Sequence, residues 1–162
     1  EEIKEGDLVL SYDEKTGKSA YKRVLSLSRN VTKKWCEVSL IINGKKETIT
    51  STPGHKYYLP DNDSNRDINE VLEHASYIGL SSRWVSAKDL KCGDKVLLSN
   101  GSYGIIDSVV IDDLDHEEIT YNFEVEDYHT YFVGDSEVCV HNAHCGNREL
   151  NQLKKEIMQL YK

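Results

Sequence analysis

One eight-residue pattern occurs twice in this sequence, at residues 3–10 and again at residues 90–97. Both copies read apolar-Lys-x-Gly-Asp-x-Val-Leu, and both are followed by a glycine-containing turn, at Gly17 and Gly101. Glycine and aspartate before alternating apolar residues are typical of a turn that leads into a strand. Two copies are too few for a solenoid, which needs at least three stacked repeats. The duplication therefore predicts two related β halves with pseudo-two-fold symmetry.

Stretches rich in β-branched and aromatic residues fill most of the chain up to residue 140. Asn43-Gly44 lies between two of them, and this dipeptide is a strong signal for a hairpin turn. Ser86 to Leu90 is typical of one helical turn, with the Ser86 side chain as N-cap. Strands are predicted at residues 7–12, 21–27, 35–42, 47–52, 104–111, 119–125, 130–133 and 138–140. The pattern predicts an all-β domain of short antiparallel strands.

The composition changes after residue 146. Leu150, Leu153, Ile157 and Leu160 recur at helical spacing, with Lys, Glu and Gln between them. This spacing predicts an amphipathic C-terminal helix. We therefore expect the β domain over residues 1–142, followed over residues 143–162 by a linker and helix that lead to a downstream segment.

The last predicted strand ends in Val140-His141-Asn142-Ala143. The side-chain nitrogen of Asn142 can attack its own main-chain carbonyl, close a succinimide and release the amine of Ala143. This reaction needs a proton for the leaving nitrogen, donors for the oxyanion and a held geometry. His141, and His129 in the preceding hairpin, are side chains that transfer protons near neutral pH. A polar turn after an edge strand explains the same residues without any chemistry, and this stretch alone leaves both interpretations open.

Three motifs occur in an order that resembles the Hint superfamily, the self-processing module of inteins, hedgehog autoprocessing domains and bacterial intein-like domains. The resemblance covers about residues 1–143 and looks most like the form found ahead of the toxin in bacterial polymorphic toxins. The matching motifs are Thr52-Pro53-Gly54-His55, Tyr121 to Val133 with His129, and Val140-His141-Asn142. The resemblance implies a pseudo-two-fold horseshoe of antiparallel strands, into which the duplicated pattern fits.

The resemblance also implies roles for these residues. Thr52 and His55 would polarise an upstream scissile amide and protonate its leaving nitrogen. His141 and His129 would assist the cyclisation of Asn142. A tight turn at Pro53-Gly54 suits the first pair, because it brings a hydroxyl and an imidazole to one side of a strand end.

The sequence departs from this family at three points. Relatives begin with a cysteine or serine that attacks the preceding carbonyl, about one strand and a turn before the residues that match Glu2 and Ile3. We therefore expect the first strand and its nucleophile to be missing from this chain. Ala143 has no nucleophilic side chain, which favours cleavage over splicing. Asn122 stands where many inteins carry an aspartate, so a proton-handling role is weakened or reassigned there.

The sequence thus predicts a single-turnover, intein-like domain that cleaves the Asn142–Ala143 bond and releases or presents a downstream toxin segment. The alternative is a catalytically silent β scaffold or linker module of a secreted bacterial toxin. The expected partners are the flanking polypeptide, a toxin domain and its immunity protein. The domain is expected to be a monomer, secreted or on the cell surface as part of a larger bacterial protein.

Composition and charge disfavour several other classes of function. The net charge of -8 disfavours nucleic-acid binding, and no apolar run reaches the length of a membrane span. No cofactor is expected, because the sequence contains no glycine-rich phosphate loop. No metal site is expected either, although Cys139, His144 and Cys145 are weak candidates for zinc ligands. The simpler interpretation of Cys139 is a small apolar strand residue.

Overall fold

The computed structural model describes residues 3–62 and 83–141, and most of these residues lie in β-strands. One 3₁₀ turn, η2 (Ala87–Asp89), falls where a helical turn is predicted. The predicted all-β fold is therefore confirmed, whereas the predicted C-terminal helix and the boundary at Asn142 lie outside the described residues. The strands are β1 (Leu8–Asp13), β2 (Lys18–Ile42), β3 (Lys45–Ser51), β4 (Lys56–Tyr58), β5 (Trp84–Ser86), β6 (Lys95–Leu97), β7 (Tyr103–Val125), β8 (Thr130–Val133) and β9 (Val138–His141).

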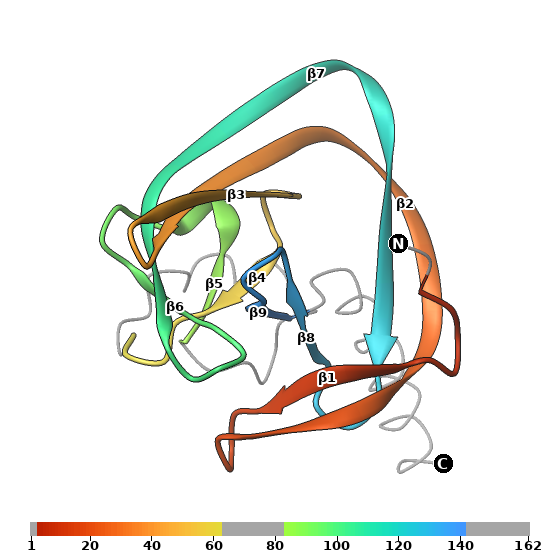
Figure 1. The fold of residues 1–162 in the computed structure, drawn as a ribbon. Coiled ribbons are helices and arrows are strands. Elements are labelled where there is room, and N and C mark those ends of the chain that lie inside the picture. The colour runs from red at the N-terminus through yellow and green to blue at the C-terminus, as the bar shows by residue number, and fades with distance from the viewer. Residues whose placement is uncertain (1–2, 63–82, 142–162) are drawn as a thin grey trace, which may run out of the picture.

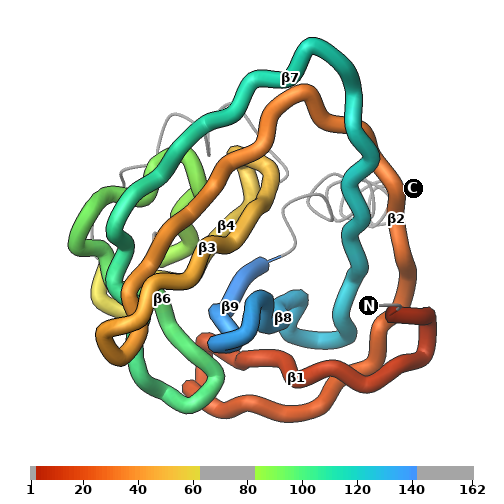
Figure 2. The backbone as a smooth tube through the Cα atoms, turned by 45° about the horizontal axis from the view of Figure 1, so that its top comes forward, coloured from red at the N-terminus to blue at the C-terminus, as the bar shows by residue number. Residues whose placement is uncertain are grey.

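Two of the strands are much longer than predicted. β2 runs for 25 residues and β7 for 23, where the sequence predicts two short strands in each. The antiparallel pairing of β2 with β7 continues through the polar segments 28–34 and 112–118, which show no apolar alternation. Three register shifts interrupt this ladder and let the ribbon bend. Figures 1 and 2 show the two strands side by side along an arch.

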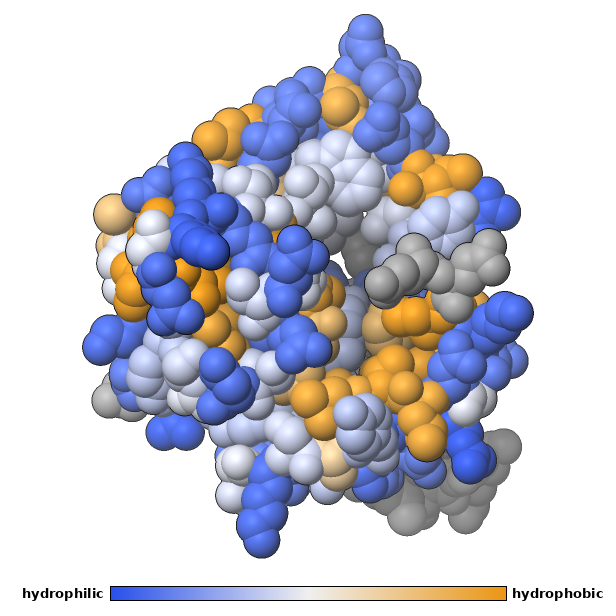
Figure 3. Space-filling model, in the orientation of Figure 1, coloured by the Kyte–Doolittle hydropathy of each residue, from blue (hydrophilic) through white to orange (hydrophobic). Residues whose placement is uncertain are grey.

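The strands form two antiparallel sheets. The larger has the order β1-β2-β7-β6, with β3 also paired to β2, and the smaller has the order β5-β4-β9-β8. In both views β8 and β9 lie inside the arch (Figures 1 and 2). Side chains from both sheets form the main core, which includes Val38, Leu40, Tyr57, Val85, Ile106, Val125, Tyr131 and Val140. Tyr58, Trp84, Leu97 and Cys139 form a smaller apolar cluster. The space-filling view shows a hollow within the arch, with apolar residues gathered beside it (Figure 3).

The duplicated pattern builds the same turn twice. In each copy the glycine has a positive φ, 90° at Gly6 and 92° at Gly93, a conformation that glycine adopts without a steric cost. In each copy the aspartate closes the turn by accepting the main-chain N–H of the lysine three residues earlier, at 2.9 Å for Asp7 and 2.7 Å for Asp94. Each glycine N–H then donates at 2.8 Å to a long strand, to the carbonyl of Val24 in β2 or of Ile106 in β7. This pairing gives the horseshoe its pseudo-two-fold relation.

Among the described residues, no helix is long and apolar enough to cross a membrane.

Candidate functional site

The Thr52-to-His55 turn joins β3 to β4. The His55 N–H donates to the Thr52 carbonyl at 3.1 Å and closes the turn. Both side chains are buried, and both line one cavity of about 360 Å³. The structure thus brings the Thr52 hydroxyl and the His55 imidazole to the same cavity, where a positioned donor and a proton carrier can act on one group.

Asn122 of β7 and Tyr131 of β8 form another part of the wall of this cavity. Asn122 is 3% exposed, and its Oδ1 accepts the Tyr131 hydroxyl at 3.1 Å and the Phe123 N–H at 3.2 Å. These two donors fix the orientation of the amide. Its Nδ2 has no acceptor within residues 3–62 and 83–141. An amide does not titrate near neutral pH, so Asn122 can donate a hydrogen bond here but cannot carry a proton.

His141 and His129 form a second group at the end of β9. His141 is buried and pairs with Lys56 of β4 on one side and Thr130 of β8 on the other. His129 lies in the turn before β8, and its ring centroid is 6.3 Å from that of His141, with 43° between the ring planes. The structure therefore places the two predicted histidines next to each other, and His141 directly precedes Asn142 in the sequence. Asn142, Ala143, His144 and Cys145 lie outside the described residues.

The backbone of His129 has a φ of 57°, in the left-handed region that non-glycine residues seldom occupy. The next residue, Thr130, anchors this turn to β1. Its Oγ1 accepts the Tyr12 N–H at 2.7 Å and donates to the Tyr12 carbonyl at 2.8 Å, while its carbonyl accepts the Ser11 hydroxyl at 2.7 Å. The surroundings thus hold His129 in a conformation that costs energy, as is common for residues at functional sites.

The two groups use opposite faces of the small sheet. Side chains alternate along a strand, so Lys56 and His141 share one face, whereas their neighbours Tyr57 and Val140 point to the other. The His55 ring lies on the latter side, 6.2 Å from the ring of Tyr131. The structure therefore pairs Thr52 with His55 and His129 with His141, but it does not merge the four into one cluster.

Two residues beside His141, Lys56 and Trp84, were not predicted from the sequence. Lys56 is 1% exposed, and its Nζ donates to the Ser86 hydroxyl at 2.7 Å. Ser86 precedes η2 as predicted, but its side chain makes no capping hydrogen bond, so the predicted N-cap role is wrong. Trp84 lies 5.3 Å from the ring of His141. The available signal was a charged side chain, Lys56, or an indole, Trp84, in an otherwise apolar strand. This signal could not be interpreted from the sequence, because only the strand order of the sheet brings both residues beside His141.

Cys139 is fully buried in β9, and this burial raises the pKa of its thiol far above the usual range. A thiol that resists ionisation is a poor zinc ligand, because the metal binds the thiolate. Cys36, Cys92 and Cys139 are all free, and no group of three metal-binding side chains occurs in the part of the chain that the structure describes. Cys139 thus packs as a small apolar residue.

Comparisons with known proteins identify relatives of this fold. A family model described as the pretoxin HINT domain matches residues 61–143. The solution structure of a bacterial intein-like domain from Clostridium thermocellum is similar over 86% of this chain and 84% of that chain, with 31% identity and a TM-score of 0.68. No curated protein matches the chain.

Two inteins of lower identity share the fold. A DnaB intein from Synechocystis is 17% identical over 86% of this chain and 80% of its own, with a TM-score of 0.58. The gp41-1 intein is 22% identical over 86% of this chain and 83% of its own, with a TM-score of 0.55. At these identities the likeness concerns the arrangement of strands alone.

Proposed function

The chain belongs to the pretoxin Hint domain family, an intein-like self-processing fold, and from this premise we propose that it cleaves its own backbone between Asn142 and Ala143 by asparagine cyclisation. In this step Nδ2 of Asn142 bonds to its own carbonyl carbon. The bond from that carbon to the nitrogen of Ala143 breaks, and this nitrogen takes up a proton. The products are a domain that ends in a succinimide and a segment that begins at Ala143 with a free amine.

The observation that carries this proposal is the His129–His141 pair, with ring centroids 6.3 Å apart, because His141 ends β9 and directly precedes Asn142 in the sequence. The reaction needs a base when Nδ2 attacks and an acid when the amine of Ala143 leaves. Imidazole is the side chain that most often serves as a general base or a general acid near neutral pH. The pair therefore suits both proton transfers.

We assign Thr52 and His55 to a bond upstream of the domain. Their shared cavity supports this role, since a hydroxyl donor and an imidazole can polarise a carbonyl and protonate a leaving nitrogen. Asn122 would then donate a hydrogen bond through Nδ2 without moving a proton. Because this amide stays neutral, Asn122 would help to polarise a carbonyl in the cavity through a hydrogen bond.

The wider context follows from the family. We propose that residues 1–142 are the processing domain and that residues 143–162 lead to a toxin segment, which an immunity protein would bind. The flanking polypeptide is the substrate in this scheme. The parent protein would be secreted or displayed by a bacterium.

The test is the intact mass of the purified chain during incubation at neutral pH. The parent should lose residues 143–162, and the remaining fragment should be lighter by one water molecule than a fragment cut by hydrolysis, because it ends in a succinimide. Asn142→Ala removes the attacking nitrogen and should stay intact. Cleavage of Asn142→Ala at the parental rate would point to an outside protease, and a parent chain that stays intact would favour the silent scaffold.

A further inference from the structure

Trp84 begins β5 and is 2% exposed. Its ring centroid lies 5.3 Å from that of His141, with 70° between the ring planes, an edge-to-face arrangement. β4 separates β5 from β9 in the sheet (Figure 1), so the two backbones are about 10 Å apart. The indole therefore spans the width of β4 to reach the histidine at the end of β9.

The register places both rings on one face of the sheet. Lys56 pairs with both Ser86 and His141, and Tyr58, two residues further along β4, pairs with Trp84. Residues two apart in a strand point to the same side, so Trp84 and His141 share a face. The ring of Tyr58 packs against the indole with centroids 4.8 Å apart. Tyr58, the cross-strand partner of Trp84, thus limits the movement of the indole.

A hydrogen bond fixes the orientation of the indole. Nε1 of Trp84 donates to Oε1 of Glu14 at 3.1 Å, and Glu14 lies in the turn between β1 and β2. A carboxylate is a stronger acceptor than a neutral group, which makes this bond an effective anchor. The indole is therefore anchored at its nitrogen while its ring contacts the imidazole of His141.

We propose that Trp84, anchored by Glu14, is a positioning residue that holds the imidazole of His141 in the orientation its proton transfer requires. The proposal rests on the proposed function, in which His141 moves a proton during the cyclisation of Asn142. A base or acid acts only when its nitrogen lies within hydrogen-bond reach of the reacting group. An edge-to-face contact restricts the tilt of the histidine ring, so in this proposal Trp84 acts through His141.

The first test measures release of residues 143–162 from the full chain. Trp84→Leu removes the ring contact and should slow release roughly 2- to 10-fold, the effect expected for one aromatic pair. Trp84→Phe keeps an aromatic ring and should recover part of the rate. Tyr103→Leu is the control, because the Tyr103 ring also has one specific contact, with Nζ of Lys95 at 6.0 Å, but Tyr103 begins β7 in the other sheet. It should release the segment at the parental rate.

The second test does not depend on cleavage. The nuclear Overhauser contacts of the His141 ring with residues other than Trp84, measured in the Asn142→Ala background, should change in Trp84→Leu and stay in place in Tyr103→Leu. A parent that fails to cleave would remove the proposed function, and the contacts of the His141 ring would still decide whether Trp84 orients the ring.

A folded Trp84→Leu chain that releases the segment at the parental rate would overturn the proposal. If Trp84→Leu does not fold, Glu14→Ala replaces it, because that change frees the indole nitrogen and leaves the ring present. Slower release in Glu14→Ala supports the proposal, and parental release there overturns it.

Discussion

The phenol of Tyr131 donates a 3.1 Å hydrogen bond to Oδ1 of Asn122, in the wall of the cavity that Thr52 and His55 also line. Tyr131→Phe should therefore lower the free energy of unfolding by about 1 kcal/mol, the net value of a typical buried hydrogen bond. Urea denaturation measures this difference. Tyr121→Phe is the control, since Tyr121 is 72% exposed and its hydroxyl loses little. Equal stability of the Tyr131→Phe chain and the parent would contradict the hydrogen bond.

The histidine pair predicts a kinetic signature. His129→Asn removes the imidazole but keeps a residue that tolerates the left-handed backbone at φ 57°, and His141→Gln removes the second imidazole. Each change should slow release of residues 143–162 by roughly 10²- to 10⁴-fold, the usual value of a positioned acid or base.

The double variant should cost less than the product of the two single effects, because groups that act as a unit are not additive. Time courses of intact mass for the parent, the two single variants and the double variant measure this. Single variants that are as fast as the parent would leave both histidines with a structural role only.

Replacing the glycine in either turn of the duplicated pattern should lower the stability of the fold by a similar amount. A Cβ added at Gly6 or Gly93 meets no atom within 4 Å, so alanine there is strained by the backbone alone, with φ near 90° at both positions. Gly6→Ala and Gly93→Ala should each destabilise the fold by roughly 1–2 kcal/mol. Thermal and urea denaturation would show this, and the double variant should show the sum because the sites are independent. A loss at only one position would mean that the two turns are not equivalent.

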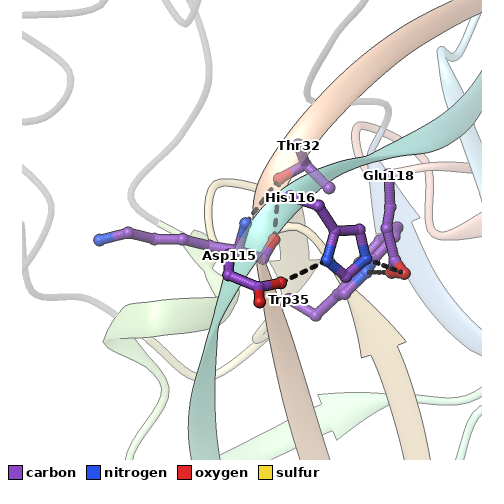
Figure 4. Close-up of polar contacts among 6 residues, drawn as sticks. Thr32, Trp35, Asp115, His116 and Glu118 are labelled. Atoms are coloured by element: carbon purple, nitrogen blue, oxygen red, sulfur yellow. Dashed lines mark hydrogen bonds and ion pairs between the residues drawn. The ribbon is translucent and has the colours of Figure 1, made fainter.

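His116 of β7 gives a pH-dependent prediction. Its Nδ1 lies 2.6 Å from Oδ1 of Asp115 and its Nε2 lies 3.2 Å from Oε2 of Glu118 (Figure 4). The Asp115 carboxylate, and next that of Glu118, raise the pKa of His116. Because the folded pKa is raised, the stabilisation is fully present below about pH 6.5 and is lost as the pH rises through the folded pKa.

The titration of His116, followed by nuclear magnetic resonance, tests this interaction. Asp115→Asn should lower the pKa of His116 towards its ordinary value. Glu117→Gln is the control, since it removes a nearby charge that makes neither of these two contacts. Identical His116 titrations in the parent and in Asp115→Asn would rule out the pairing.

The fold class and both turns of the duplicated pattern could be predicted from the sequence. Glycine in a turn and alternating apolar residues in a strand determine the conformation of their own segment, so a local pattern shows them. The sequence was insufficient for the length of β2 and β7. Val31 and Ile119 pair across the middle of the arch, yet 59% and 45% of their surfaces are exposed. A ribbon without a buried face has no reason to alternate apolar and polar residues, so its strands leave no periodic signal.

The residues of the candidate site also fall into two groups, those that the sequence indicated and those that only the structure revealed. Thr52, His55, His129 and His141 were proposed from the order of the motifs, and their catalytic roles stay predictions. The structure places Thr52 and His55 at one cavity and the His129 ring beside the His141 ring. Lys56 and Trp84 were not found, because their position beside His141 depends on the strand order β5-β4-β9-β8. That order is a long-range property, which no local pattern encodes.

β9 comes last among the described strands in chain order, yet it lies in the interior of its sheet, between β4 and β8. A ribosome therefore completes both strand partners of His141, Lys56 and Thr130, before it completes His141 itself. Until β9 inserts, the imidazole lacks Lys56 on one side and Thr130 on the other. If the domain cleaves as proposed, cleavage must follow the docking of β9, because a nascent chain without docked β9 lacks the surroundings of His141.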